Sequence, residues 1–289
     1  MKQISIIAAK GGVGKTAISG AFASYLENTI FVDCDTESSD LRTLLHAKTK
    51  EESFVDTIER VRIAEDECIR CGLCKALCHF DAVINPYGVY QIVEEHCQAC
   101  DLCLKACPVS AIEHVKKEKN LWGIAETRFG DLLYAQLALG EDLNGSLISI
   151  LRERARELAQ EKKSDFILID GPPAMGFAVA SAIALSDITV VVIESSPSAI
   201  HDLHKSIQLA KRYEVPAVCL INKSDLNPKM TDEIKAYCNK NGISLIGEIQ
   251  FDVQFMEAQL ASKSIIEYAP NSQTSVLIKQ SLYSLINFK

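Results

Sequence analysis

Short apolar runs and segments with helical apolar spacing follow one another along the chain, and this pattern predicts most of its elements. Runs that predict buried strands occur at residues 4–9, 29–35, 165–170, 188–193, 215–221 and 243–249. Helices are predicted at residues 17–26, 41–62, 146–160, 198–212 and 272–288. Residues 120–139 are expected to form two strands that turn at Phe129-Gly130-Asp131, with a helix over 132–139 as the alternative.

Composition narrows the class of protein. The chain has 289 residues, 48% of them hydrophobic, which suits one large or two modest domains with a sizeable core. A net charge of −8 argues against nonspecific nucleic-acid binding, because that needs clustered lysine and arginine. No apolar run approaches about 18 residues, and residues 1–9 are too short for a signal peptide, so we expect a soluble, cytoplasmic protein without a membrane anchor. Eleven cysteines in a reducing compartment then indicate metal ligands rather than disulfides.

The sequence between the first predicted strand and the first helix is a phosphate-binding loop. The loop and the first residues of its helix are Gly11, Gly12, Val13, Gly14, Lys15, Thr16 and Ala17. Glycines let backbone N–H groups close around phosphate oxygens, and the helix points its positive dipole end at them. Lys15 is expected to reach the β- and γ-phosphates, and Thr16 to ligate Mg²⁺. A plain glycine turn is the alternative, and the Gly-Lys-Thr order argues against it.

The loop departs from the ordinary G-x-x-x-x-G-K-[ST] motif, because position 9 is alanine and Lys10-Gly11-Gly12 follows. In this it resembles the deviant loop of the MinD/ParA/nitrogenase-iron-protein group of ATPases. The resemblance implies a homodimer with ATP sandwiched at its interface. It also implies that Lys10 reaches the nucleotide of the second subunit and stabilises charge on the transferring phosphoryl group, like an arginine finger supplied in trans.

Carboxylates follow two of the predicted strands, at the edge where open α/β sheets bind ligands. The V-D-x-D pattern of the family implies that Asp35 orients or deprotonates the attacking water. Asp33 and Asp40 could hold Mg²⁺-bound waters or the moving switch. The strand that ends at Asp170 resembles a Walker-B arrangement, with the carboxylate near Mg²⁺, and Gly171 would let the backbone approach the γ-phosphate. Surface acids that cap the next segment are the alternative for Asp35 and Asp40.

The residues after the predicted strand at 215–221 indicate which nucleotide base is bound. Asn222-Lys223-Ser224-Asp225 resembles the guanine-reading N-K-x-D of GTPases, whereas in the MinD group the asparagine contacts adenine. The loop type favours ATP, so Asn222 and Lys223 are assigned to its binding. Relatives usually have proline where Gln250 stands, which leaves purine contacts there open.

Eight of the cysteines form two runs with the same spacing. The runs are Cys68, Cys71, Cys74 and Cys78, then Cys97, Cys100, Cys103 and Cys107, each 29 residues after its counterpart. Two such runs are the signature of bacterial two-cluster ferredoxins, in which the fourth cysteine of each run ligates the other cluster. We therefore expect one 4Fe–4S cluster on Cys68, Cys71, Cys74 and Cys107, and another on Cys97, Cys100, Cys103 and Cys78.

Two features qualify the cysteine assignment. Zinc sites with four cysteines also use C-x2-C pairs, but a third cysteine at the same spacing, twice over, is wasteful for zinc. His79 follows Cys78 where the ferredoxin pattern has proline, as Pro108 follows Cys107, and could shift the potential of that cluster.

Taken end to end, the chain resembles the MinD-superfamily P-loop ATPases that carry an inserted ferredoxin domain. The resemblance implies an α/β fold, with a doubly wound, mostly parallel sheet interrupted after its second strand by a small α+β ferredoxin-like domain. The expected boundaries are residues 1–59 and 118–289 for the ATPase domain and 60–117 for the insert. The last helix has few lysines for a membrane surface and is expected to pack on the sheet.

Three functions remain open at this point. The first is a redox ATPase, in which nucleotide-driven dimer changes gate electron transfer through the insert to an unidentified acceptor protein. The second is an iron–sulfur carrier or assembly ATPase of the Mrp/Nbp35 kind, although Cys219 and Cys238 resemble buried small hydrophobes rather than its exposed C-x-x-C. The third is a positioning switch whose clusters are structural or sensory. The loop at residues 140–145 could shape a partner site near the nucleotide.

Overall fold

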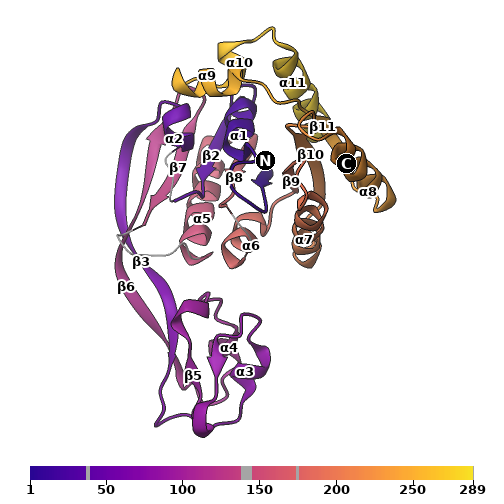
Figure 1. Cartoon of the computed structure of the whole chain (residues 1–289). Coiled ribbons are helices and arrows are strands. Elements are labelled where there is room, and N and C mark those ends of the chain that lie inside the picture. The colour runs from indigo at the N-terminus through magenta and orange to yellow at the C-terminus, as the bar shows by residue number, and fades with distance from the viewer. Residues whose placement is uncertain (37–39, 138–144, 174–175, 289) are drawn as a thin grey trace.

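A main lobe of alternating strands and helices is joined by a long two-stranded ribbon to a small lobe (Figure 1). The computed structural model describes residues 1–36, 40–137, 145–173 and 176–288, with the side chains of residues 56–60 and 116–119 left out of that description. The candidate partner loop at 140–145 lies outside it except for Gly145. The large sheet contains β1 (Lys2–Ile7), β2 (Thr29–Asp33), β3 (Lys48–Ile63), β6 (Ile112–Glu126), β7 (Asp131–Gln136), β8 (Phe166–Asp170), β9 (Ile188–Glu194), β10 (Ala217–Asn222) and β11 (Leu245–Glu248).

The sheet is mostly parallel, as expected. Its strand order is β11-β10-β9-β1-β8-β2-β7-β6-β3. All pairs from β11 to β7 are parallel, and the last two, β7–β6 and β6–β3, are antiparallel. The carboxyl ends of β1, β2, β8 and β9 therefore meet at one edge. The register places Asp33 opposite Asp170 at that edge.

Helices cover both faces of the sheet, so the main lobe is doubly wound (Figure 1). They are α1 (Lys15–Ala23), α2 (Asp40–Leu44), α5 (Gly145–Lys162), α6 (Phe177–Ile183), α7 (Ala199–Arg212), α8 (Pro228–Lys240), α9 (Gln254–Leu260), α10 (Ile265–Tyr268) and α11 (Gln273–Ile286). Ile4 and Ile6 of β1 point into one core with α1 and α11, whereas Ile7 points into another with α7 and α8. A third core packs α5 against β2 and β8. The alternation of strand side chains thus supplies a core to each face.

The predicted helix at 41–62 is largely wrong. Only Asp40–Leu44 is helical, and residues 48–63 form the strand β3, which pairs along its length with β6. The helical spacing in this stretch was weak, and the pairing partner lies some 60 residues later in the chain. Strand formation here is therefore a tertiary effect that a local pattern does not show. The strand pair at 120–139, in contrast, forms as β6 and β7.

The small lobe lies at the far end of the β3–β6 ribbon, at the bottom of Figure 1. It contains α3 (Leu73–Leu77), a short antiparallel pair of β4 (Val83–Ile84) and β5 (Gln91–Ile92), and α4 (Leu102–Ala106). The ribbon is paired continuously from Lys48↔Glu126 to Ile63↔Ile112, apart from bulges. The expected boundaries at 59/60 and 117/118 fall inside this ribbon. A division at the ribbon's far end, near residues 64 and 111, is the one we propose.

The carboxyl-terminal helix α11 packs on the sheet edge at β11, with Ile278, Leu282 and Leu285 buried in the core. This position agrees with the prediction that the last helix packs on the sheet. Within the residues the structure describes, no helix has the length and apolar character needed to cross a membrane.

Candidate functional site

The phosphate-binding loop joins β1 to α1 and is braced by the end of β10. Gly14 has a φ of 95°, a left-handed conformation that suits glycine. The Asn222 side-chain amide donates to the Val13 carbonyl oxygen at 2.8 Å. A Cβ on Gly14 would lie 2.3 Å from the Nδ2 of Asn222, so the close approach of this side chain requires glycine. Asn222, which the sequence assigned to the nucleotide, therefore also shapes the loop.

Asp170, at the end of β8, accepts hydrogen bonds from three side chains of α1. Its Oδ1 accepts from Lys15 Nζ at 2.9 Å and from Ser19 Oγ at 2.7 Å. Its Oδ2 accepts from Thr16 Oγ1 at 2.8 Å. Ser19 was missed by the sequence reasoning, although its position four residues after Lys15 on a helix places both on one face. The structure thus brings the predicted Lys15, Thr16 and Asp170 together.

The Lys15–Asp170 pair is buried, since the two residues are 7% and 1% exposed. Burial alone lowers the pKa of Lys15, but the Asp170 carboxylate, together with those of Asp33 and Asp35, outweighs it and holds the pKa above its ordinary value. The ammonium group therefore remains charged at the base of the loop. A buried ion pair of this kind is strongly weakened when one partner is removed, because the other charge is left without compensation.

Asp33 is the last residue of β2, and Asp35 follows it two residues later. Burial first, and then the charge of Asp170, raises the pKa of Asp33 well above its ordinary range. The Asp35 N–H donates to Asp33 Oδ1 at 3.0 Å, and both carboxylates contribute to the raised pKa of Lys15. Among the described residues, no three His, Cys, Asp or Glu side chains form a group suited to one metal ion. Magnesium in phosphate sites characteristically takes only one or two carboxylates, with the phosphates as further ligands.

Gly171 approaches β1 closely. Its N–H donates to the Ile6 carbonyl at 2.8 Å. A Cβ at this position would lie 2.8 Å from the same oxygen and 2.9 Å from Ile7 Cγ2. Packing against β1 is therefore a sufficient reason for glycine after Asp170, whether or not a phosphate lies nearby.

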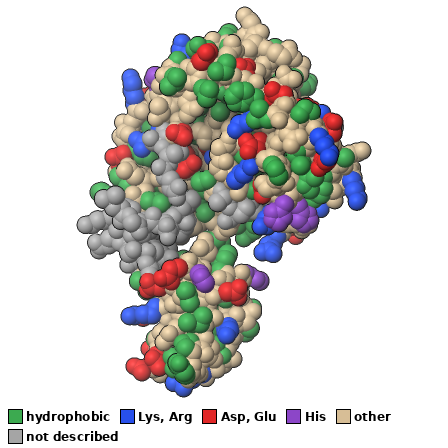
Figure 2. Space-filling view, viewed as in Figure 1, with side chains coloured by type: hydrophobic (Ala, Val, Ile, Leu, Met, Phe, Trp, Pro, Cys, Tyr) green, Lys and Arg blue, Asp and Glu red, His purple; other side chains and the backbone are tan. Residues whose placement is uncertain are grey.

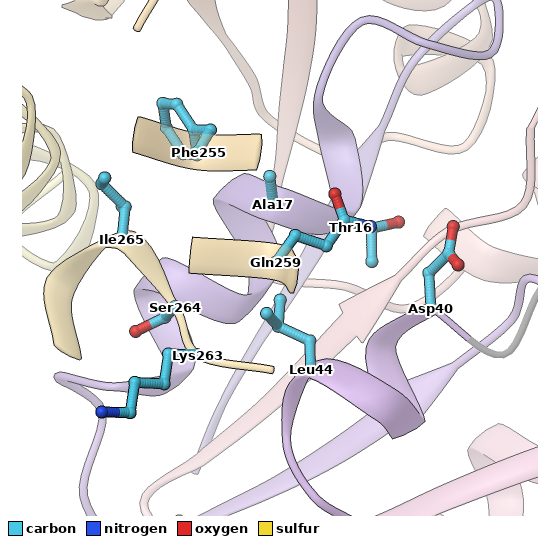
Figure 3. A pocket seen from close by; sticks show the side chains of 9 residues that line it. All are labelled: Thr16, Ala17, Asp40, Leu44, Phe255, Gln259, Lys263, Ser264 and Ile265. Atoms are coloured by element: carbon cyan, nitrogen blue, oxygen red, sulfur yellow. The ribbon is translucent and has the colours of Figure 1, made fainter. Parts of the chain in front are cut away.

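Asp40 begins α2 and lines a small pocket together with Thr16 (Figure 3). The remaining lining residues are Ala17, Leu44, Phe255, Gln259, Lys263, Ser264 and Ile265. In Figure 3, Asp40 and Thr16 lie at one end of this pocket and Lys263 at the other. The helix that carries Asp40 is thus placed against the start of α1.

A second pocket adjoins the first, because the two share Ala17, Phe255 and Gln259. Its other lining residues are Gly12, Gly14, Asn222, Lys223, Gln250, Phe251, Asp252 and Met256. The Asp225 carboxylate accepts from the Phe251 backbone N–H at 2.6 Å. Asp225, the last residue of the N-K-x-D segment, is thus hydrogen-bonded to a residue that lines the pocket. An apolar pocket with a few polar groups beside a phosphate loop suits a nucleoside.

Lys10 is bound within its own subunit. Its Nζ lies 2.9 Å from Glu194 Oε1 and donates to Ser196 Oγ at 2.8 Å. The Lys223 Nζ lies 3.0 Å from Oε2 of the same Glu194 and donates to the Gly12 carbonyl at 2.6 Å. Burial raises the pKa of Glu194, but the two lysines outweigh it and lower the pKa overall. Glu194 and Ser196 were not predicted as site residues, because only the pairing of β1 with β9 brings them to the loop.

The backbone of the small lobe repeats at the 29-residue interval of its cysteines. Left-handed residues at Arg70, Gly72 and Asp81 correspond to those at Ala99, Asp101 and Ser110. The helices α3 and α4 follow the second residue of each set, and the cysteines that end them, Cys78 and Cys107, have φ/ψ of −74°/113° and −71°/114°. The internal duplication is therefore present in the fold.

Two groups of four cysteines lie near one another in the small lobe, although within the residues that the structure describes no three of them have the geometry of a site for one metal ion. One cavity is lined by Cys68, Cys71, Cys74 and Cys107, together with apolar side chains from both halves of the lobe. In the other set, burial first and then the nearby thiols of Cys97, Cys100 and Cys78 raise the pKa of Cys103 to about 11. The fourth cysteine of each run therefore lies with the first three of the other run.

Comparisons with known proteins agree with the geometry of the main lobe. The model of the AAA_31 family, described as an AAA domain, matches residues 1–218. The uncharacterized protein MJ0578 of Methanocaldococcus jannaschii is 30% identical over 292 residues, covering 99% of this chain and 97% of the relative.

Two solved structures show the same fold. The septum site-determining protein MinD of Pyrococcus horikoshii, complexed with Mg-ADP, aligns with a TM-score of 0.60 at 16% identity, covering 99% of this chain and 96% of that one. A ParA family ATPase from Chlorobium tepidum aligns with a TM-score of 0.59 at 17% identity, covering 98% of each. Because the family model spans the phosphate loop, Asp35 and Asp170, the chain belongs to the AAA_31 family of AAA domains, and its fold is that of the MinD/ParA-type P-loop ATPases.

Proposed function

We propose that this chain is an ATP-hydrolysing iron–sulfur protein, in which a nucleotide-dependent dimer switch is coupled to electron transfer through two 4Fe–4S clusters. One observation carries the proposal: a single chain joins a charged phosphate loop to two gathered sets of four cysteines through a continuous ribbon. Only residues 45–47 separate α2, which borders the loop, from β3 of that ribbon.

The nucleotide chemistry is assigned to groups already in place. Lys15 would bind the β- and γ-phosphates, while Thr16 and Asp170 would hold Mg²⁺, with Asp33 and Asp40 as candidates for its waters. Bound Mg²⁺ neutralises charge on the phosphate oxygens. Asp35 would orient or deprotonate the attacking water, and Lys10 would act on the nucleotide of a second copy of the chain in a homodimer.

Two features of the small lobe support the proposed clusters. The four-cysteine sets match the ligand count of 4Fe–4S clusters, which when bound supply one-electron transfer. The lobe also has little apolar core: no residue of α3 or α4 is buried, and the buried apolar residues elsewhere in it are mostly small, namely Ala82, Val83, Ala99 and Ala111. So small a unit usually needs disulfides or metal to fold, and its cysteines are free.

A route for electrons to leave the lobe is suggested by its surface. Hydrophobic side chains gather on the small lobe at the bottom of Figure 2. Around the cavity of the first cysteine set, Ile69, Leu73 and Val109 are 60%, 41% and 40% exposed, and Cys71 is also exposed. A cluster at this position would lie near the surface, where short transfer distances to an acceptor protein are feasible.

An iron–sulfur carrier is the second candidate function, and fewer features of the structure support it. Cys219 and Cys238 are 0% and 2% exposed, so neither can present a transferable cluster at the surface. A carrier role would have to use the cysteines of the small lobe itself.

Coupling between the two lobes tests the proposal. If a redox-linked switch operates, the affinity for ATP should differ about tenfold between reduced and oxidised protein, which corresponds to about 1.4 kcal/mol or about 60 mV. Linkage requires that nucleotide shift the reduction potential by the same factor. Arg42 of α2 lies 3.7 Å above the Tyr134 ring, and the Tyr134 hydroxyl donates to Glu52 of β3, so Tyr134 of β7 connects α2 to the ribbon.

The measurement is ATP affinity by calorimetry under anaerobic conditions, with dithionite-reduced and oxidised protein. Equal affinities would remove redox gating and leave the clusters structural or sensory. An Arg42→Ala variant that retains ATP binding should show a smaller difference than the wild type, because it loses the contact with Tyr134.

A second prediction concerns the base. We expect ATP to be preferred over GTP by at least about tenfold in competition binding, because guanine reading needs a carboxylate that Asp225 already uses on the Phe251 N–H. An Asp225→Asn variant should keep the preference. A clear preference for GTP would instead mean that Asp225 leaves Phe251 to read the base.

A further inference from the structure

The contact of Lys10 with Glu194 raises a question that the proposed function leaves open. The lysine that would act on the nucleotide of a second subunit is held here by its own subunit, 2.9 Å from Glu194 Oε1 and 2.8 Å from Ser196 Oγ. A side chain with these partners must leave them before it can cross a dimer interface.

Glu194 is placed to hold and then release this lysine. It stands at the carboxyl end of β9, next to β1, and each of its two oxygens binds a different lysine. If Lys10 leaves, Lys223 still compensates the carboxylate, and Lys223 is itself tied to the Gly12 carbonyl. The departure of one lysine therefore leaves no partly buried charge unpaired, which keeps the cost of switching low.

The Lys10–Glu194 ion pair is more exposed to solvent than the Lys15–Asp170 pair. The Lys10 and Glu194 side chains are 37% and 22% exposed, whereas those of Lys15 and Asp170 are 8% and 0% exposed. Half-exposed ion pairs are weak and reversible, so Lys10 is held in place without being locked. Phosphate charge at the loop offers the lysine a stronger alternative partner.

We propose that Glu194, assisted by Ser196, is a positioning residue that holds Lys10 on its own subunit before ATP is sandwiched between two copies. Release of Lys10 from Glu194 is then part of dimer formation, and Glu194 opposes dimerisation until nucleotide is bound. This inference rests on the proposed role of Lys10 in trans.

A double-mutant cycle between Lys10 and Glu194 tests it. In the full-length protein with a non-hydrolysable ATP analogue, Glu194→Gln should lower the dimer dissociation constant by about two- to fivefold, the range expected for a half-exposed ion pair. In a Lys10→Ala background the same substitution should leave that constant unchanged. Ser196→Ala should shift it in the same direction by a smaller factor. Dimer formation is measured by analytical ultracentrifugation.

Matched controls separate the possible causes. Glu248→Gln makes the same change at the end of β11, where Glu248 pairs with Lys235 at 2.6 Å, and should leave dimerisation unchanged. The affinity of the monomer for ADP shows whether Glu194→Gln also changes nucleotide binding through Lys223 and Gly12. An equal effect of Glu194→Gln in both backgrounds would overturn the inference, because Glu194 would then act through Lys223. If Lys10→Ala alone neither weakens the dimer nor slows hydrolysis, the trans-lysine part of the proposed function fails instead.

Discussion

Replacing Lys15 with alanine is expected to abolish measurable ATP binding. The ammonium group is the cation at the base of the phosphate loop, and it is 2.9 Å from a buried Asp170. Its removal deletes the charge that would face the β- and γ-phosphates and leaves the Asp170 carboxylate uncompensated beside them. Truncating one partner of a buried charge pair across a binding interface costs roughly 2–5 kcal/mol, so losing the contact between lysine and phosphate should lower the affinity about 30-fold or more.

The measurement is nucleotide binding by calorimetry or fluorescent-analogue displacement. Because the variant also loses an internal ion pair, its melting temperature must be recorded, and Lys15→Arg provides a version that keeps the charge and spares Asp170. Lys205→Ala, an exposed lysine on α7, serves as the control that should bind normally. Retention of wild-type affinity by a folded Lys15→Ala protein would contradict the assignment of the loop.

Anaerobically purified protein is expected to contain about eight irons per chain, since two 4Fe–4S clusters are proposed. The internal repeat provides matched variants. Cys71→Ser should remove the cluster of the first set and Cys100→Ser that of the second, so each should retain about four irons. The two variants together should leave none, and the small lobe should then lose protection from proteolysis because it has so little apolar core of its own.

Iron and sulfide analysis with visible absorption and electron paramagnetic resonance measures this directly. Cys219→Ala is the control, because Cys219 is buried in the main lobe and belongs to neither set. Two zinc ions per chain, without visible charge-transfer absorption, would contradict the cluster assignment. Loss of all iron from either single variant would mean that the two sets are not independent.

The sequence alone identifies candidate groups where the residues of a site lie close together along the chain. The phosphate loop lies within residues 10–17, and each cysteine run within 11 residues, so spacing alone identifies the groups. The proposed crossed ligand sets rest on the ferredoxin pattern, and the structure adds that the equal cysteine spacing is accompanied by equal local conformation at Arg70 and Ala99. Buried strands of the parallel sheet were also predictable, because strands covered on both faces are apolar throughout.

Only the tertiary structure decided what distant segments do to one another. The stretch at 41–62 is mostly strand because β6 lies beside it, and nothing local in its side chains requires that. Ser19 donates a hydrogen bond to Asp170 only because the fold brings β8 beside α1. Glu194 pairs with two lysines because β9 lies next to β1. Local sequence determines which side chains are available and how each segment prefers to fold. Which charges meet is determined by strand order, since that order sets which strand ends share an edge of the sheet.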